Sequence, residues 1–402
     1  MKSGPPDAVP PPEAQVDRLI EAARRELAQG GLRAMSFRRL GDAVGATSGA
    51  LAYHLGAKAA ILNEVVTRER LRDRRWHDEW LERLDGLERV DRQALAAILE
   101  QYLDALVQGE ARLTQLIWMD LTLRAPRDAE VATLVAPWLA ERRGFWSRLF
   151  EGRIEDAAIW AGLAAAYVTD EGFNGLVVGD DPDYRLLRRM AIDRLASRLE
   201  RDGVGLEPLF SRLVRRMDRR LGLPTGDVAA DAMGPGPRRE AALAACHVLV
   251  DGGAEALTHR AVAERAGLSR SAVGYYFRTA ADLFKAAISG VYLIADGRGA
   301  PPTLPPGADP TLWRGQTVVR GELAVILAAA RDPTLAPYVI DQRRWRGVSY
   351  VRLLRSKGYS GLDALDGQTA SMIATGQTIL SGVDGDDRRD PLVSWLIARH
   401  KD

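Results

Sequence analysis

The stretch LAQGGLRAMSFRRLGDAVGATSGALAYHLGAKAAIL, from Leu27 to Leu62, has a counterpart in LVDGGAEALTHRAVAERAGLSRSAVGYYFRTAADLF, from Leu249 to Phe284. The two stretches align without a gap at a constant offset of 222 residues. Self-similarity at a fixed offset is the sequence signature of a duplicated structural unit. We therefore expect the same local fold to occur twice in one chain.

Matched residues fall where the backbone of a short helical motif requires them. Paired glycines in each copy are suited to end a first helix, because glycine accepts left-handed conformations. A hydroxyl then caps a second helix, a glycine makes a tight turn, and another hydroxyl caps a third helix. These pairs are Gly30–Gly31 with Gly252–Gly253, Ser36 with Thr258, Gly45 with Gly267, and Thr47 with Ser269; the apolar set Leu40, Val44, Leu51 and Leu55 matches Val262, Ala266, Val273 and Phe277. Each copy therefore predicts a helix-turn-helix.

Both segments resemble the N-terminal domain of the TetR family of transcription regulators. The strings that carry the resemblance are GATSGALAYHLGAK, Gly45 to Lys58, and GLSRSAVGYYFRTA, Gly267 to Ala280. Two departures from the family pattern stand out. Leu55 replaces the usual phenylalanine, and Ala280 replaces the lysine that opens the fourth helix, although Arg278 could substitute for it.

The resemblance implies that the third helix of each head enters the major groove while flanking residues hold phosphates. The implied phosphate contacts are Arg38, Tyr53, His54 and Lys58 in the first copy, and Arg260, Tyr275 and Tyr276 in the second. The implied base-reading residues are Thr47, Ser48, Gly49 and Ala50, and Ser269, Arg270 and Ser271; the caps Ser36 and Thr258 complete the DNA-binding set. Only the second reading set contains an arginine that can bond guanine twice. The heads should therefore prefer different half-sites in an asymmetric operator.

The charge of the whole chain does not indicate nucleic-acid binding, but the charge of the two predicted heads does. The net charge is +1, whereas residues 17–75 hold twelve Arg and Lys against seven Asp and Glu, and residues 238–291 hold seven against five. A local basic excess is what phosphate binding requires. Much of the first excess comes from Arg68, Arg70, Arg72, Arg74 and Arg75, which could equally form a solvated helix face.

Elsewhere the hydrophobic periodicity is helical, which predicts an all-α protein. Helices are expected at Gln93–Val107, Glu130–Phe150 and Ile154–Val178, and a weak second repeat pairs Ala136-Pro137-Trp138 with Ala336-Pro337-Tyr338. Stretches rich in proline and glycine serve as boundaries. We expect a disordered tail at 1–13, a first head at 14–75, a helical ligand-binding or dimerisation-like domain at 76–221, a linker at 222–237, a second head at 238–295, a loop at 296–310 and a shorter helical domain at 311–402.

The resemblance implies that each helical domain pairs with another copy and binds a small effector. Because both units share one chain, we favour an intramolecular pseudo-dimer, which the linker promotes through high effective concentration; a homodimer with four heads is the alternative. Aromatic residues could line an effector pocket, although aromatics at helical spacing are more often core, and the polar Asp120, Asp170, Asn174 and Gln377 could orient a ligand or join helices. The candidate pocket residues are Trp118, Trp138, Phe145, Trp146, Tyr167 and Phe173.

Other classes of protein find little support. No metal-ligand spacing links the five histidines, and no nucleophile elbow or phosphate-binding glycine loop occurs, so we expect neither an enzyme nor a cofactor or metal. No apolar run is long enough to span a bilayer, the start lacks a secretory signal, and the one cysteine cannot form an internal disulfide, which favours the cytoplasm. The function indicated is a repressor that an effector releases from DNA. The alternative is a helical interaction or ligand-binding protein in which one or both heads are degenerate.

Overall fold

In the computed structural model of this protein, the described residues are 12–45, 58–200, 206–221, 233–300, 310–384 and 392–401. Within these ranges the chain is helical, and the one extended pairing is an isolated bridge between Tyr359 and Lys401. The prediction of an all-α protein is confirmed. The expected tail to residue 11, most of the linker and of the loop, and residues 385–391 lie outside the described residues.

The first unit begins with three helices that belong to a head: α1 (Pro12–Ala34), α2 (Phe37–Val44) and α4 (Lys58–Arg83). Its helical domain contains α5 (Arg92–Leu106), α6 (Gly109–Arg124), α7 (Ala129–Phe150), α8 (Ala157–Val178), α9 (Pro182–Ala196) and α10 (Glu207–Leu221). Helices α5, α7 and α8 correspond to the three that periodicity predicts. Aspartate caps α5, α7 and α9, since the side chains of Asp91, Asp128 and Asp181 accept hydrogen bonds from first-turn amides.

The second unit repeats this order in shorter form. Its head contains α12 (Pro237–Gly252), α13 (His259–Ala266), α14 (Arg270–Tyr276) and α15 (Ala280–Ala295). Its helical domain contains α16 (Pro310–Arg331), α17 (Ala336–Ser356), α18 (Ala364–Asp384) and α19 (Leu392–Ile397). Among the described residues between α15 and α16 there is no helix corresponding to α5.

Short 3-10 turns relate the two helical domains. Ala125–Arg127 joins α6 to α7, and Pro333–Leu335 joins α16 to α17, with Pro126 and Pro333 near the start of each turn. The predicted correspondence between Ala136-Pro137-Trp138 and Ala336-Pro337-Tyr338 is wrong, because the two motifs occupy different positions in their helices. Pro137 lies inside α7, whereas Pro337 lies in the first turn of α17, where proline is readily accepted because no backbone amide is needed there.

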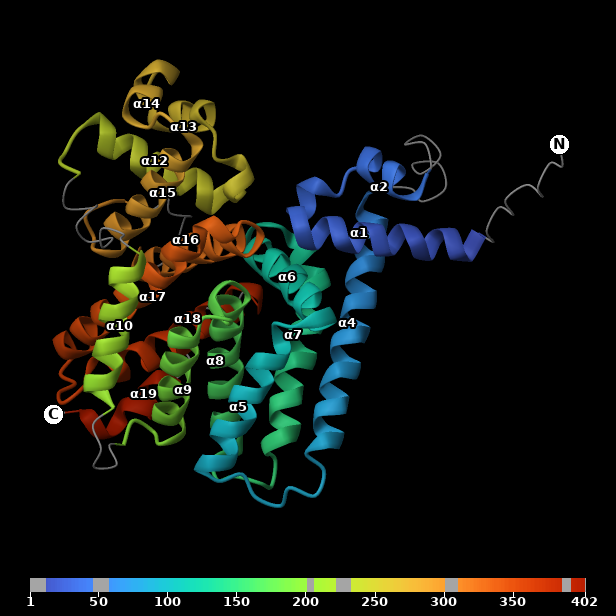
Figure 1. Ribbon diagram of the computed structural model, residues 1–402, viewed down its shortest axis with the longest axis vertical. Helices are drawn as coiled ribbons and strands as arrows, with labels where there is room; N and C mark the ends of the chain where they lie inside the picture. Colours follow the sequence, from blue (N-terminus) through green and yellow to red (C-terminus); the bar gives the residue numbers. More distant parts are fainter. Residues whose placement is uncertain are drawn as a thin grey trace.

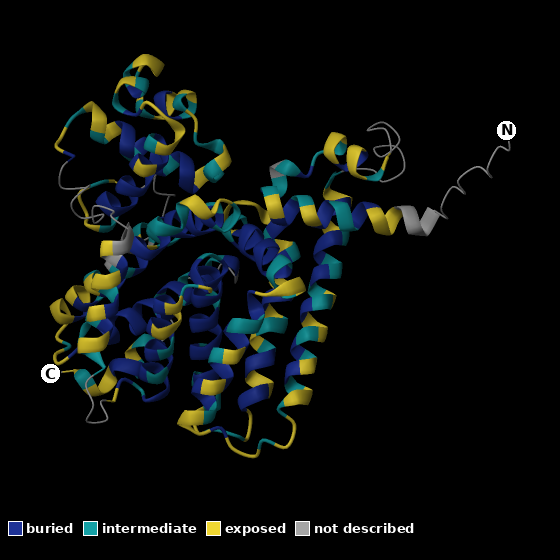
Figure 2. Cartoon of the chain, in the orientation of Figure 1, coloured by how far each residue is buried: buried dark blue, intermediate teal, exposed yellow. Residues whose placement is uncertain are grey.

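The two units pack on each other through α8 and α18, as expected of a pseudo-dimer. The backbones of these helices come very close, because a Cβ built on Gly376 would overlap the carbonyl oxygen of Ala166. Helix α10 extends this junction, since Phe210, Leu213 and Met217 share a buried apolar cluster with Ile340 of α17. Figure 2 shows that the helix faces at the centre of this shared core are buried. The halves therefore form one continuous core.

Both heads lie on the same side of that core (Figure 1). Helices α13 and α14 occupy one upper corner and α2 the other, while α4 leads from the first head down along the helical domain. No helix within the described ranges is long and apolar enough to cross a membrane.

Candidate DNA-binding heads

The second head has the cap and turn geometry of a helix-turn-helix. The hydroxyl of Thr258 accepts a hydrogen bond from the Ala261 amide at 3.2 Å, and that of Ser269 accepts one from the Ala272 amide at 3.1 Å. Gly267 has a φ of 65°, the left-handed conformation that the tight turn between α13 and α14 requires. Each hydroxyl cap contributes about 1 kcal/mol to its helix. These features confirm the caps and the turn predicted for this copy.

An apolar interior fixes the angle between α13 and α14. Val262, Val273 and Phe277 are at most 4 % exposed, whereas Ala266 is half-buried. His259 forms a hydrogen bond between the two helices that the sequence analysis did not predict. Its Nε2 lies 2.6 Å from the carbonyl oxygen of Phe277, so the imidazole N–H donates from the start of α13 to the end of α14. The α14 helix is therefore held in a set orientation on the head.

Residues predicted to face DNA in the second head are on the surface. Arg270 is exposed at the start of α14, and Tyr275 is 77 % exposed at its end. Arg260 is exposed as well and lies 3.2 Å from Glu264 on its own helix, a weak surface pair. The remaining members of the set are Thr258, Ser269 and Ser271, which are exposed, and Tyr276, which is half-buried. This face can therefore approach a groove without first unfolding.

An acidic capping box occupies the start of α15. Thr279 and Asp282 exchange hydrogen bonds of 3.0 Å between side chain and backbone amide in both directions. The Thr279 hydroxyl and backbone lower the pKa of Asp282, so this carboxylate is ionised at neutral pH. Neighbouring Ala280 offers no cation. The fourth helix of this head thus begins with a negative charge where the first head has Lys58.

The first head shows the same geometry as far as it is described. The Ser36 hydroxyl accepts a hydrogen bond from the Arg39 amide at 3.4 Å, Gly45 has a φ of 69°, and Leu40 is buried while Arg38 is exposed. Its third helix lies outside the described residues. So do the predicted contacts Thr47, Ser48, Gly49, Ala50, Tyr53 and His54, and the expected core residues Leu51 and Leu55.

Lys58 has a structural partner that sequence reasoning did not foresee. Its ammonium donates a 2.6 Å hydrogen bond to the carbonyl oxygen of Leu32, which joins the start of α4 to the end of α1. Burial and the nearby Arg124 lower the pKa of Lys58. An ammonium has three donors, so this bond leaves donors for a phosphate. A phosphate contact for Lys58 stays a prediction.

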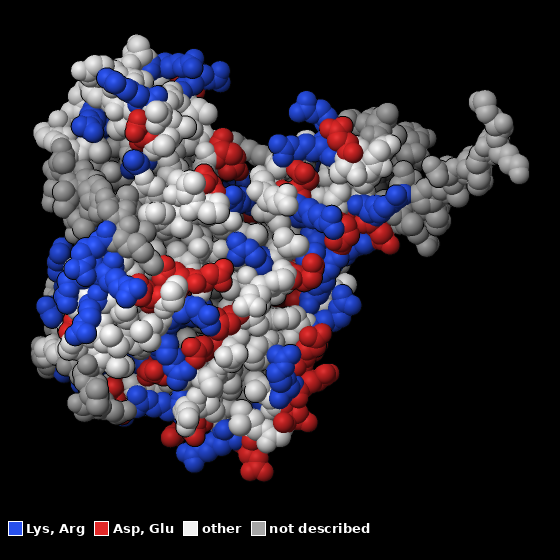
Figure 3. All heavy atoms as spheres, in the orientation of Figure 1, with Lys and Arg blue, Asp and Glu red and all other residues white. Residues whose placement is uncertain are grey.

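Basic side chains lie on the outer end of the second head, while those along α4 alternate with acidic ones (Figure 3). Arg68 pairs with Asp17 and Glu64, Arg72 pairs with Glu21 and Glu69, and Arg70 and Arg74 approach Glu141. Four of the five arginines that raised the local charge of the first copy are thus ion-paired within the protein. Glu141 is the one of these acidic partners that lies outside residues 17–75, so it adds one negative charge beside α4 that the local count does not include.

A buried ion pair anchors the first head to the helical domain. Arg24 of α1 lies 2.7 Å from Glu69 of α4, a carboxylate with no exposed surface. Thr114 of α6 donates to the second oxygen of Glu69 at 2.7 Å, and Glu110 also pairs with Arg24. Because a buried carboxylate without its partner is costly, this arrangement holds α1, α4 and α6 as one body. A movement of α6 would therefore move the head.

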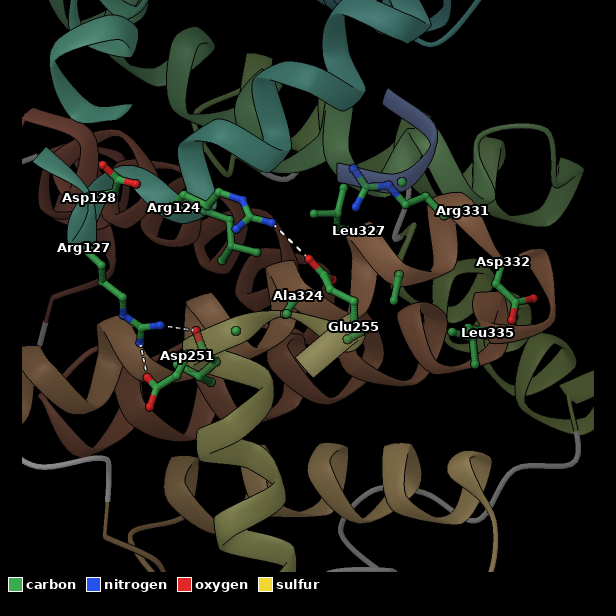
Figure 4. A pocket seen from close by; sticks show the side chains of 17 residues that line it. Arg124, Arg127, Asp128, Asp251, Glu255, Ala324, Leu327, Arg331, Asp332 and Leu335 are labelled. Carbon is green, nitrogen blue, oxygen red and sulfur yellow. Dashed lines mark hydrogen bonds and ion pairs between the residues drawn. The ribbon is translucent and has the colours of Figure 1, made fainter. Parts of the chain in front are cut away.

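Arginines cross between the two units beneath the heads (Figure 4). Arg124 and Arg331 stand at equivalent positions, at the ends of α6 and α16. Arg124 of the first unit reaches Glu255 of the second head at 3.1 Å, and Arg331 of the second unit reaches Asp120 of α6 at 2.7 Å. Arg124, Glu255 and Arg331 border a cavity of about 540 Å³ between the second head and the core. Each head is thus braced against both units.

The polar residues singled out for a ligand take part in this kind of contact. Asp120 pairs with Arg124 and Arg331, and Asp170 lies 3.1 Å from Arg346 of the second unit. Asn174 donates to the carbonyl oxygen of Asp170. The alternative that these groups join helices is therefore confirmed for Asp120 and Asp170. Nothing in their local sequence could have identified partners some 200 residues away.

The aromatic residues proposed for an effector pocket are deeply buried and closely packed. Trp118 and Trp138 lie edge to face, and Arg142 stacks over Trp118 while both its guanidinium and the Trp138 indole bond Asp73. Phe145 and Trp146 of α7 pack against Tyr102, and Tyr167 and Phe173 are buried residues of α8. All six residues are at most 2 % exposed: Trp118, Trp138, Phe145, Trp146, Tyr167 and Phe173. A role for them in effector binding stays a prediction.

Comparison with known proteins gives one finding, and it concerns both heads. The sequence profile described as "Bacterial regulatory proteins, tetR family" matches residues 19–65 and 243–287. These segments run from α1 into α4 and from α12 into α15. The curated proteins to which the chain was compared include no match. The duplicated motif, its caps and the profile therefore identify the same two segments.

Proposed function

Because this chain is a TetR-family DNA-binding regulator with two TetR-like units, we propose that it represses transcription by placing both heads on one asymmetric operator. The observation that carries this proposal is the position of two chemically different heads on one side of a single continuous core. Two heads on the same side of one core can reach successive major grooves, about 34 Å apart. The cytoplasm, where such an operator would be found, is the compartment we propose.

Asymmetry follows from the reading residues. Arg270 is exposed and can form two hydrogen bonds with a guanine, a contact worth ~1–3 kcal/mol of discrimination. The first head would instead approach the bases with Thr47, Ser48, Gly49 and Ala50, which suit contact with thymine methyl groups and recognition of groove shape. Two identical chains would favour a palindrome. One chain with two unlike heads favours two unlike half-sites.

A monomeric pseudo-dimer is the assembly we propose. Helix α8 of the first unit packs on α18 of the second, so each unit already has a partner within the same chain. The segment that joins α10 to α12 keeps the halves at high effective concentration, so pairing does not depend on protein concentration. A homodimer with four heads is the alternative, and a solution mass near twice 44.0 kDa would establish it.

Release by a small effector completes the proposed mechanism. An effector that binds better to a form with misplaced heads would draw the population away from DNA. The crossed arginines provide a route, since Arg124 and Arg331 tie each helical domain to the head of the other unit. A shift of α6 or α16 would then change the position of both heads together.

A second candidate function has one observation in its favour. The second head begins its fourth helix with Ala280 and the ionised Asp282, which would repel a phosphate rather than hold it. In that case the second head would serve as a structural partner, and DNA contact would rest on the first head alone. Arg278, which is exposed beside this position, is the cation that could restore the contact.

A gel-shift series separates these functions. Purified protein is titrated against DNA from upstream of its own gene at several salt concentrations. We expect sequence-selective binding that weakens steeply with salt, because phosphate contacts release counterions. Arg38→Ala and Arg260→Ala should each weaken binding, whereas the exposed Arg352→Ala on α17 should not. Absence of selective binding would end the regulator proposal, and indifference to Arg260→Ala alone would favour the second candidate.

A further inference from the structure

A second cavity lies between the two units. It has a volume of about 390 Å³, within the range of small-molecule sites, ~300–1,000 Å³. Its walls come from α6, the following 3-10 turn and α7 of the first unit, and from α16 and α18 of the second. A ligand in this cavity would contact both halves at once.

The lining is apolar with a few polar groups, and one charge among them. Trp313, Val319 and Leu323 form the α16 wall, and Ile379 and Val383 belong to the α18 wall. The one ionisable side chain among the lining residues is Arg320, and no carboxylate lines the cavity with it. An uncharged apolar ligand would leave this guanidinium unused, and a cation would be repelled by it.

Arg320 is buried and lacks a partner within the described part of the chain. Its side chain is 6 % exposed, and its Nε and Nη2 atoms have no hydrogen-bond partner. Thr122, which lines the cavity from α6 of the first unit and is 2 % exposed, has a hydroxyl that is unpartnered as well. Buried arginine is normally paired, because a desolvated charge without a counterion is strongly destabilising. Two unsatisfied groups, one from each unit, that line the same cavity indicate a ligand that satisfies both.

We propose that this cavity binds a small amphipathic monoanion, an aliphatic or aromatic carboxylate, between the two units. The carboxylate accepts from the Arg320 guanidinium, whose planar fork matches its two oxygens, and from the Thr122 hydroxyl. The hydrocarbon body occupies the apolar wall of α16 and α18. This binding site stands on its own geometry. It would also serve as the effector site of the proposed repressor, a step that rests on the proposed function.

Binding is tested on the full chain without DNA, so that its outcome is separate from that of the gel shift. Octanoate and 2-naphthoate are the probes, and 1-octanol and 2-naphthol, which present the same hydrocarbon body without the carboxylate, are the controls. Calorimetry gives the dissociation constants, and the melting temperature gives a second readout, because a ligand that binds only the folded state raises it. We expect at least one carboxylate to bind at least ten times more tightly than its neutral control.

Arg320→Met supplies the decisive variant, and Arg352→Met on the exposed face of α17 is its matched control. Removal of an unpaired buried charge should raise the melting temperature of the ligand-free protein, so the variant is expected to fold. It should lose at least tenfold in carboxylate affinity and keep its affinity for the neutral control, while Arg352→Met changes neither. Equal binding of carboxylates and neutral controls by the unaltered protein, no binding of either carboxylate, or undiminished carboxylate binding by Arg320→Met would each overturn the proposal.

Discussion

Arg331 and Asp120 form an ion pair across the two units, with the Nη2 atom 2.7 Å from Oδ2. Asp120 is 1 % exposed, and Arg331 also donates to the backbone carbonyls of Leu27 and Ala28 at 3.2 Å. One side chain of the second unit therefore bonds both the core and the head of the first. This relationship gives the pseudo-dimer a specific link between the halves.

Arg331→Met should weaken the joined fold and the placement of the first head. Three hydrogen bonds are lost, and Asp120 keeps only Arg124 as its ionic partner, so we expect ~1–3 kcal/mol less free energy of unfolding. Urea denaturation measures this loss, and the gel shift should show weaker DNA binding in parallel. Arg352→Met is the matched control. A change of stability below about 0.5 kcal/mol, the usual scatter for surface substitutions, would contradict the assigned link.

Gly376→Val tests the close crossing of α18 with α8. A side chain at this position would overlap the Ala166 backbone, which cannot move aside as a flexible side chain could. Overpacking of this kind costs ~1–3 kcal/mol or more, and we expect the halves to lose their joint, cooperative unfolding. Gly315→Ala on α16, where an added Cβ meets open space, is the control and should be neutral or stabilising. Equal unfolding curves for the two variants would show that the helices do not cross there.

Glu322 predicts a pH dependence of stability. Burial of its carboxyl, against the attraction of Arg346 at 3.6 Å, raises its pKa from 4.5 to about 7. The folded protein then holds a proton that the unfolded chain releases above pH 4.5, so Glu322 lowers stability as pH rises from about 4.5 to 7. Glu322→Gln should therefore gain stability over the unaltered protein between pH 5 and 8, by roughly 3 kcal/mol at pH 8. The exposed Glu79→Gln is the control. A gain in the free energy of unfolding of Glu322→Gln that is the same at pH 5 as at pH 8 would disprove the raised pKa.

The heads were predictable because their determinants are local. A hydroxyl before each short helix and a glycine at each turn are set by backbone requirements, and they recur at one offset, so Thr258, Gly267 and Ser269 fall where the sequence places them. The helices of the first domain were equally predictable, because hydrophobic periodicity within one segment indicates which face of its helix is buried. Local rules therefore suffice for elements and for the motif.

Contacts between the halves were not predictable in this way. Arg331 and Asp120 are 211 positions apart, and neither has a local feature that selects the other. The buried aromatics illustrate the same limit. The position of Trp118 in the helical pattern would be the same whether its ring lined a cavity or filled the core, so the sequence could not distinguish the two. The unpaired state of Arg320 likewise depends on what four other segments fail to supply. Such features come from tertiary packing alone.

Hydroxyl-radical footprinting of the upstream DNA, with the mass of the complex measured by light scattering, tests the central claim that one chain places two unlike heads on one operator. We predict one 44.0 kDa chain per duplex and two protected segments of different sequence about one helical turn apart. Arg270→Ala should remove protection at one segment only. Two identical protected segments held by two chains, or the loss of both segments in Arg270→Ala, would contradict the account.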